Sequence, residues 1–276
     1  MIIVKLTGGL GNQMFQYAFG KVCSIKAHEP LFLDLSWYRN KNSKRRFLLD
    51  ELNVSYDRYS NNRFVIGAMK LLKNPAVLKD NGFFEEKNLE IRGNALLEGS
   101  WESYKYFEAI SSDIKKGFTL KKPSERFTEL SRKIKKDSIA VHVRRGDYLI
   151  PHGKYLNGAD YYNKGVERIL KDKSLKDPQI TIFSDDPKWC ETELKSLAGQ
   201  PTEVFDEKLD SDTEELMLMS LYGNNIISNS TFSWWAAYLN PHPDKTVVMP
   251  VNWFTEKERN GRYLEGMKVP EWIMID

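Results

Sequence analysis

Two neighbouring arginines, Arg144 and Arg145, directly follow a run of strand-forming residues at positions 139–143. Each guanidinium group can bind a phosphate through two N–H donors and keeps its charge at physiological pH. Side by side, the two could neutralise a pyrophosphate without a metal ion. The alternative is a surface pair held in ion pairs with Asp or Glu. The position favours a ligand, because open α/β sheets bind ligands beyond the carboxyl ends of their strands.

A loop that contains Gly9 and Gly11 follows the first strand-like run and precedes a helical pattern. Its backbone N–H groups could approach an anion closely, since glycine has no side chain. The amides of Asn12 and Gln13 could bond sugar hydroxyls or phosphate oxygens, although Asn12 could instead cap the helix. A dinucleotide-binding fingerprint would require a third glycine where Met14 stands.

Two adjacent carboxylates, Asp185 and Asp186, end another strand-like run, and Pro187 follows at a position typical of a first helical turn. One carboxylate would cap the helix, and the other could accept hydrogen bonds from guanine or from ribose hydroxyls. Metal binding is a further interpretation of this pair and of Asp210 and Asp212. We expect no metal, because adjacent carboxylates on a turn are a weak metal signature and the latter pair precedes a helix that it could cap.

A hydroxyl-rich segment, residues 229–235, separates a strand-like run from an apolar helix. Ser230, Thr231 and Phe232 stand where the N–H groups of a helix N-terminus could bind phosphate oxygens, with the helix dipole adding ~0.3 to 1 kcal/mol. Ser230 could cap the helix at the same time. The chain lacks a nucleophile elbow, a Walker A sequence and a zinc motif, which argues against serine hydrolases, P-loop proteins and metalloproteases.

These segments need a scaffold of alternating strands and helices. Residues 2–6, 12–27 and 30–35 predict a strand, a helix and a second strand, and residues 95–98 predict a further strand. After a charged stretch at 115–136, strands are predicted at 139–143, 179–184, 203–205, 225–228 and 246–249, with helices between them. This alternation is typical of parallel sheets covered on both faces. We therefore predict an α/β protein with domains at residues 1–135 and 136–276.

The bulk composition is that of an ordinary globular protein, with 41% hydrophobic and 29% charged residues. No apolar run approaches the ~20 residues of a spanning helix, and the start does not resemble a signal peptide, so we expect cytoplasmic residence. A net charge of +3 gives no indication of nucleic-acid binding. Basic clusters at residues 41–46 and 115–136 are solvated surfaces, or they attract the chain peripherally to an anionic membrane leaflet or an anionic glycan.

Four segments in this order, GGLGNQMFQYA, HVRRGD, FSDD and ISNSTFSWWAAYLN, resemble the bacterial-type α-1,2-fucosyltransferases of glycosyltransferase family 11. The resemblance covers both halves of the chain and is weakest between residues 40 and 90. It implies a GT-B fold, in which two Rossmann-like domains face each other across a cleft, with the acceptor on the N-terminal side and the donor on the C-terminal side. It also implies a role in the biosynthesis of O-antigen or another glycan.

The reaction implied by the resemblance is transfer of L-fucose from GDP-β-L-fucose to O2 of a terminal galactose of an oligosaccharide, with inversion and without a metal or other cofactor. Arg144 and Arg145 would hold the pyrophosphate, with Arg145 stabilising charge on the departing β-phosphate. His142 and either Asp185 or Asp186 would face the guanine. The remaining donor-binding residues would be Ser230, Thr231 and Phe232 in a phosphate-binding turn, and Gly9, Gly11, Asn12 and Gln13 in the N-terminal loop.

The attacking hydroxyl also needs a proton acceptor. Asp147 lies beside the arginines in the sequence, and His152 would titrate near neutral pH, so both are candidate catalytic bases. A late, loose transition state could also proceed without a strong base. Two other functions stay open: a nicotinamide-dependent oxidoreductase, which Asp34 at the end of the second strand would suit, and a non-catalytic module that binds sugar nucleotides or glycans. The acceptor glycan and the oligomeric state are not determined by the sequence.

Overall fold

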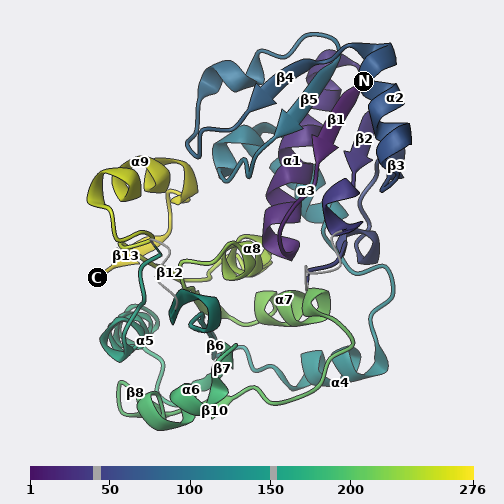
Figure 1. Ribbon diagram of the computed structural model, residues 1–276. Helices are drawn as coiled ribbons and strands as arrows, with labels where there is room; N and C mark the ends of the chain where they lie inside the picture. Colours follow the sequence, from purple (N-terminus) through teal and green to yellow (C-terminus); the bar gives the residue numbers. More distant parts are fainter. Residues whose placement is uncertain (40–44, 150–153) are drawn as a thin grey trace. The chain divides into compact units, whose positions relative to one another are not determined.

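The chain forms two compact units in the computed structural model, which describes residues 1–39, 45–149 and 154–276 (Figure 1). Unit 1 comprises Met1–Lys121 with Glu265–Met267, and unit 2 comprises Lys122–Leu264 with Lys268–Asp276. The sequence placed the boundary at residues 135 and 136. Helix α4 (Glu125–Lys133) belongs to unit 2, and its capping residue Ser124 donates its N–H and its hydroxyl to the carboxylate of Glu214, at 2.6 and 3.0 Å.

Unit 1 is built on a sheet in the order β3-β2-β1-β5-β4, and its described pairings are all parallel. The strands are β1 (Ile2–Lys5), β2 (Leu31–Asp34), β3 (Arg58–Ser60), β4 (Ala76–Lys79) and β5 (Ala95–Glu98). The apolar runs that form β1, β2 and β5 are buried on both faces, as expected for the inner strands of a parallel sheet.

Helices cover both faces of this sheet. Helix α1 (Leu10–Ala27) packs closely on one face because Gly20 has no side chain, and a Cβ there would lie 2.3 Å from Cγ2 of Val4. Helix α2 (Arg63–Lys73) covers the other face, where Ile66 packs against Ile3 and its neighbours on β2 and β5. Ile3 and Val4 are consecutive residues of β1, so their side chains point to opposite faces.

Unit 2 is built on a sheet in the order β10-β7-β6-β11-β12-β13, and its described pairings are also parallel. The strands are β6 (Ser138–Val143), β7 (Gln179–Ser184), β10 (Glu203–Val204), β11 (Asn224–Ile226), β12 (Val247–Pro250) and β13 (Ile273–Ile275). In chain order this is the 3-2-1-4-5-6 arrangement of a Rossmann sheet. The order therefore reverses between the neighbouring strands β6 and β11.

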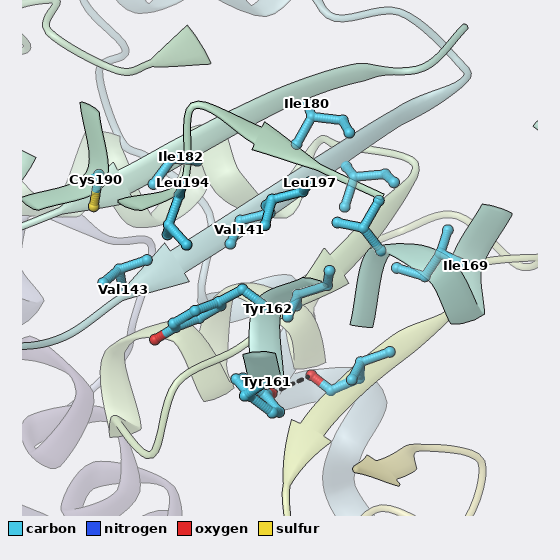
Figure 2. Close-up of a cluster of buried hydrophobic side chains, with 14 residues drawn as sticks. Val141, Val143, Tyr161, Tyr162, Ile169, Ile180, Ile182, Cys190, Leu194 and Leu197 are labelled. Carbon is cyan, nitrogen blue, oxygen red and sulfur yellow. Dashed lines mark hydrogen bonds between the residues drawn. The ribbon is translucent and has the colours of Figure 1, made fainter. Parts of the chain in front are cut away.

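Besides α4, the helices of unit 2 are α5 (Ala159–Lys173), α6 (Pro187–Glu193), α7 (Asp212–Ser220), α8 (Thr231–Leu239) and most of α9 (Lys257–Met267). Figure 2 shows the core on one face of the sheet, where Val141 and Ile182 from β6 and β7 meet Leu194, which directly follows α6, and Tyr162 of α5. These side chains are fully buried or nearly so. Strands β6 and β7 end at the same level, since their last residues, Val143 and Ser184, pair in register.

The structure confirms the α/β class and most of the predicted elements, and it adds β3, β4, β13 and α9. Helix α1 begins at Leu10 with Gly9 as its cap, so the idea that Asn12 caps it is wrong. The expected cap of α7 is also wrong in detail, because Ser211 and not an aspartate accepts the N–H of Glu214. Within the described residues, every helix is too short or too polar to cross a membrane.

Candidate functional site

The predicted site residues of unit 2 gather at the carboxyl edge of its sheet, where the strand order reverses. The segment with the two arginines follows β6, the two aspartates follow β7, and residues 227–230 follow β11. Ligands of open parallel sheets bind beyond this edge and at this kind of reversal. The fold thus brings three segments together that are about 40 residues apart in the sequence.

Arg144 is paired with Asp185, with 3.1 Å between Nη1 and Oδ2. The same carboxylate accepts the backbone N–H groups of Arg145 and Gly146, at 2.9 and 3.2 Å. Position 146 favours glycine, because a Cβ would lie 2.8 Å from Oδ2 of Asp185. The turn after β6 is therefore fastened to the turn after β7. Asp185 is not free in this structure, contrary to our expectation that one carboxylate would be left for a ligand.

Arg145 is held from two sides. Its Nε lies 3.1 Å from Oδ2 of Asp186, and its guanidinium carbon lies 3.9 Å from the ring centroid of Trp189. The other oxygen of Asp186 accepts the N–H of Trp189 at 3.3 Å, which makes Asp186 the cap of α6. The Arg145 side chain is only 13% exposed. A cation fixed in this way is oriented before any ligand arrives.

His142 lies in β6 and is buried beneath this edge. Its Nδ1 lies 2.8 Å from the hydroxyl of Ser228, which follows β11, so the pair links the two strands at the reversal. The ring of Phe232 is its neighbour, with 5.8 Å between centroids. Burial, and secondly the charge of Arg144, lower the pKa of His142 to about 3. The imidazole is therefore neutral at pH 7 and offers one donor and one acceptor.

The turn after β11 is fixed by Asn229, which is 1% exposed. Its side-chain N–H groups donate to the carbonyl oxygens of Tyr155 and Trp253, at 2.7 and 2.9 Å, and its amide oxygen accepts from Asn157 at 3.2 Å. Its own carbonyl oxygen accepts the hydroxyl of Tyr148 at 2.8 Å. Tyr148 belongs to the segment after β6, so this bond joins that segment to the turn that begins α8.

Helix α8 begins at Thr231 with Ser230 as its cap, one of the two compatible roles that the sequence offered for this residue. The Ser230 hydroxyl accepts the N–H of Phe232 at 3.3 Å, and its carbonyl oxygen accepts the N–H of Trp234 at 3.0 Å. The body of the helix is buried, including the paired Trp234 and Trp235. Its N-terminus and its positive dipole end are thus held rigidly at the carboxyl edge of the sheet.

In unit 1 the glycine-rich loop connects β1 to α1. Gly8 has φ +77°, a conformation that favours glycine, and its carbonyl oxygen accepts the hydroxyl of Tyr38 at 3.2 Å. Arg45 lies against Gly9, since a Cβ at Gly9 would be 3.5 Å from its Nη1. Gly11 and Asn12 form the first turn of α1. A cation beside this loop was not expected as a site residue. The only signal was the Arg-Arg sequence at 45 and 46, which we had assigned to a basic surface cluster.

Gln13 is fully buried and its amide is bonded to backbone groups. Its Nε2 donates to the carbonyl oxygens of Gly8 and Arg46, at 3.3 and 2.8 Å, and its Oε1 accepts the N–H of Leu48 at 2.9 Å. The residue predicted to bind a ligand directly thus joins the glycine-rich loop to the segment that carries Arg45.

The sequence predicted two candidate bases, Asp147 and His152. His152 lies outside the described residues, and of Asp147 only the backbone is described, in the short helical turn that follows Arg145.

Glu215 was not predicted from the sequence as a titratable group of interest. It lies on α7, and burial, followed by the charges of Asp212 and Asp185, raises its pKa to about 7. A carboxyl group of this kind carries no local sequence signal.

Asp34, on which the nicotinamide alternative depended, is 1% exposed. Its carboxylate accepts the N–H of Ser36 at 3.0 Å and lies 3.5 Å from Nζ of Lys70 on α2. The Asp34 carboxylate thus contacts α2, and it is too buried to meet a ribose.

In the described part of the chain, no three His, Cys, Asp or Glu side chains are grouped as metal ligands, Asp210 and Asp212 included.

The chain is similar in sequence to known glycosyltransferases. Residues 82–276 match the profile of glycosyl transferase family 11. Over 98% of its length the chain is 32% identical to the O-antigen biosynthesis glycosyltransferase WbnK of Escherichia coli, of which 99% is covered. It is also 32% identical to an α-1,2-colitosyltransferase of Escherichia coli, with 94% of each chain covered. Galactoside 2-α-L-fucosyltransferase Sec1 of Mus musculus is 27% identical over the whole chain and 74% of its own length.

Two solved structures share the fold. A mutant of FUT1 from Arabidopsis thaliana in complex with GDP superposes with a TM-score of 0.56, at 13% identity, over 89% of this chain and 69% of that one. The α-1,6-fucosyltransferase NodZ soaked with GDP-fucose superposes with a TM-score of 0.52, at 14% identity, over 87% and 92%. Both belong to the GT-B type, so the two Rossmann-like units predicted from the sequence are confirmed as a GT-B fold.

Proposed function

This chain belongs to glycosyltransferase family 11, and on that premise we propose that it transfers L-fucose from GDP-β-L-fucose to O2 of a terminal galactose of an oligosaccharide. The chain is a glycosyltransferase of the fucosyl type, which sets aside the nicotinamide-dependent oxidoreductase and the non-catalytic binding module. The identity of the donor, inversion at the anomeric carbon and the galactose acceptor are the parts that we propose. The α-1,2-fucosyl and colitosyl relatives support them.

One observation carries the proposal. Two arginines, each held by its own aspartate, lie at the carboxyl edge of the unit 2 sheet, beside a capped helix N-terminus and at the reversal of strand order. A nucleoside diphosphate is the common sugar carrier whose charge fits this arrangement. Its two phosphates would bind the guanidinium groups, and the N-terminus of α8 would add oriented N–H dipoles.

The departing phosphate determines which charge the site must stabilise. When the bond between fucose and the β-phosphate breaks, negative charge grows on the phosphate oxygen, and fixed donors stabilise that charge without having to reorganise. Arg145 is suited to this task, because Asp186 and Trp189 already orient it. We assign no metal to the reaction and expect the two guanidinium groups to supply the positive charge. The sugar is attacked on the side opposite the leaving phosphate, which inverts the anomeric carbon.

His142 is assigned to nucleotide recognition. It is neutral and buried, and its ring position is fixed through Ser228. In this structure Asp185 and Asp186 are bonded to the arginines, so either of them would meet the guanine only while also holding its arginine. Asp147 and His152 remain the proposed candidates for the base that takes the proton of the acceptor hydroxyl.

Transfer of colitose is the second candidate, because one of the two relatives at 32% identity is a colitosyltransferase. Colitose differs from fucose in lacking the 3-hydroxyl. The experiment that decides is a transfer assay with GDP-fucose and with GDP-colitose, on lactose and a panel of galactosyl oligosaccharides, with the product linkage read by NMR. We expect an α-1,2-linked fucosyl product. Turnover of GDP-colitose alone would reassign the donor, and turnover of neither donor on any galactoside would overturn the proposal.

A further inference from the structure

Helix α2 of unit 1 exposes an apolar outer face. On its inner side, Ile66 and Met69 pack against the sheet. On the opposite side, Phe64 and Leu71 are 89% and 83% exposed, and Leu72, which lies between the two sides, is 81% exposed. Positions 64 and 71 are two helical turns apart and share one stripe, with Leu72 beside it. Single exposed apolar residues are ordinary on a protein surface, but a stripe of large ones on a regular helix indicates a binding surface.

The segment that carries this face is basic, and Asp57 and Asp80 lie just outside it. Residues 58–79, which run from β3 through α2 to β4, contain three Lys, two Arg and no Asp or Glu. Arg58 pairs in register with Phe32, and Val77 with Leu96, so both lie on the side of the sheet that α2 covers. Lys79 lies two residues after Val77 and points the same way. Basic residues thus stand on both edge strands, and on β4 Lys79 lies near the exposed Val77.

An apolar groove opens beside the last turn of α2. Its lining includes Leu31, Phe32, Met69 and Leu72, and Arg58 and Lys73 also contribute to it. Asp57 lines it too, but its carboxylate accepts the N–H of Leu31 at 2.7 Å. The groove lies where β1 and β2 begin, whereas the glycine-rich loop follows the carboxyl end of β1. Within unit 1, the outer face of α2 is therefore available without blocking that loop.

We propose that the outer face of α2, with its basic surroundings, docks unit 1 on an anionic phospholipid bilayer. A helix that exposes Phe and Leu between Arg and Lys fits the boundary between headgroups and acyl chains. Arg58, Arg63 and Lys73 would lie at the level of the lipid phosphates, while Phe64, Leu71 and Leu72 enter the apolar layer. A second copy of this chain fits less well, because a symmetric contact would bring the basic residues of both copies together.

The test is co-sedimentation of the full chain with vesicles of phosphatidylcholine alone or mixed with phosphatidylglycerol. Two variants remove one contribution each: Leu71→Gln with Leu72→Gln keeps helix-forming residues, and Arg63→Glu with Lys73→Glu reverses the charge. The matched controls make the same changes at exposed residues elsewhere. They are Ile25→Gln with Met274→Gln, and Lys171→Glu with Lys176→Glu, two exposed lysines outside the basic clusters.

We expect the wild-type chain to sediment with mixed vesicles and to remain in solution with neutral ones. Each α2 variant should lower the bound fraction by ~5-fold or more, and each control by less than ~2-fold. Transfer to a soluble galactoside should be unchanged in all four variants, which shows that they fold and separates this proposal from the proposed reaction. Equal binding to neutral vesicles, no binding at all, or equal losses in the controls would overturn it. So would a dimer in sedimentation velocity that only the α2 variants dissociate.

Discussion

The Nε of Arg145 lies 3.1 Å from Oδ2 of Asp186, and Oδ1 of the same carboxylate accepts the backbone N–H of Trp189. One aspartate thus caps α6 and orients Arg145, to which we assign stabilisation of the leaving phosphate. The ring of Trp189 covers the guanidinium at 3.9 Å. The arrangement explains why adjacent acidic residues follow β7: the second caps and orients, while the first, Asp185, fastens the turn that carries Arg144.

Replacing Arg145 by Ala should lower kcat/KM by ~100-fold or more, as the loss of a donor to a developing oxyanion does. The assay is GDP release from GDP-fucose in the presence of lactose. Arg168→Ala is the matched control, because Arg168 is a half-exposed arginine of α5 that pairs with Asp172 one turn away. Arg145→Ala activity within ~3-fold of the wild type would refute the assigned role.

Asp186→Asn should separate the two tasks of this residue. Asn also caps helices, so the free energy of unfolding should fall by less than ~1 kcal/mol, whereas Asp186→Ala should lose about 1 kcal/mol more. Both variants should lower the rate of transfer, because Arg145 loses its charged partner. Urea unfolding and the GDP-release assay measure the two effects. An Asn variant with full activity would show that Asp186 serves only as a cap.

Glu215 should make stability depend on pH. Its pKa is near 4.5 when unperturbed and about 7 in the fold, so between these values the unfolded chain ionises first. Stability is therefore lost as the pH rises from about 4.5 to about 7, by up to ~3 kcal/mol. Glu215→Gln should gain that stability over the wild type at pH 8 and none at pH 4. Urea titrations at both pH values test this, and an equal difference at both would contradict it.

His142 should not titrate between pH 5 and 8, because its pKa in the fold is about 3. Its contribution to stability is present above the ordinary histidine pKa of about 6.5 and is lost as the pH falls toward 3. His142→Gln should lack this loss in acid. In the NMR spectrum, the imidazole resonances of His142 should be constant over the neutral range. A titration midpoint near pH 6.5 would show that the ring is exposed to solvent, contrary to the structure.

The sequence predicted the edge of the unit 2 sheet well, for a physical reason. Apolar runs such as Ile180 to Phe183 are buried on both faces, and a polar turn must follow where each strand ends. Ser230 was considered as a cap alongside its phosphate-binding role, because a hydroxyl before an apolar helix can accept an N–H of the first turn. The pairing of Arg144 with Asp185 could be considered only as one alternative, since nothing local joins residues about 40 positions apart.

Between residues 40 and 93 the sequence shows no clear helical or strand period. Helix α2 carries large apolar residues on its outer face as well as its inner one, so Phe64 and Leu71 obscure the period that Ile66 and Met69 would give. Strand β3 consists of Arg58, Tyr59 and Ser60 at a sheet edge, where little side-chain burial is required. Arg45 was missed as a site residue because its approach to Gly9 depends on tertiary contacts.

The central claim is that two aspartate-held arginines bind a nucleoside diphosphate at the carboxyl edge of unit 2 without the help of a metal ion. Calorimetric titration of GDP into the chain in EDTA tests it most directly, with Arg144→Ala combined with Arg145→Ala as the variant and circular dichroism as the check on folding. We predict that GDP binds the wild type in EDTA and that a folded double variant binds it ~100-fold or more weakly. Binding that requires Mn²⁺, or that survives the loss of both arginines, would contradict the claim.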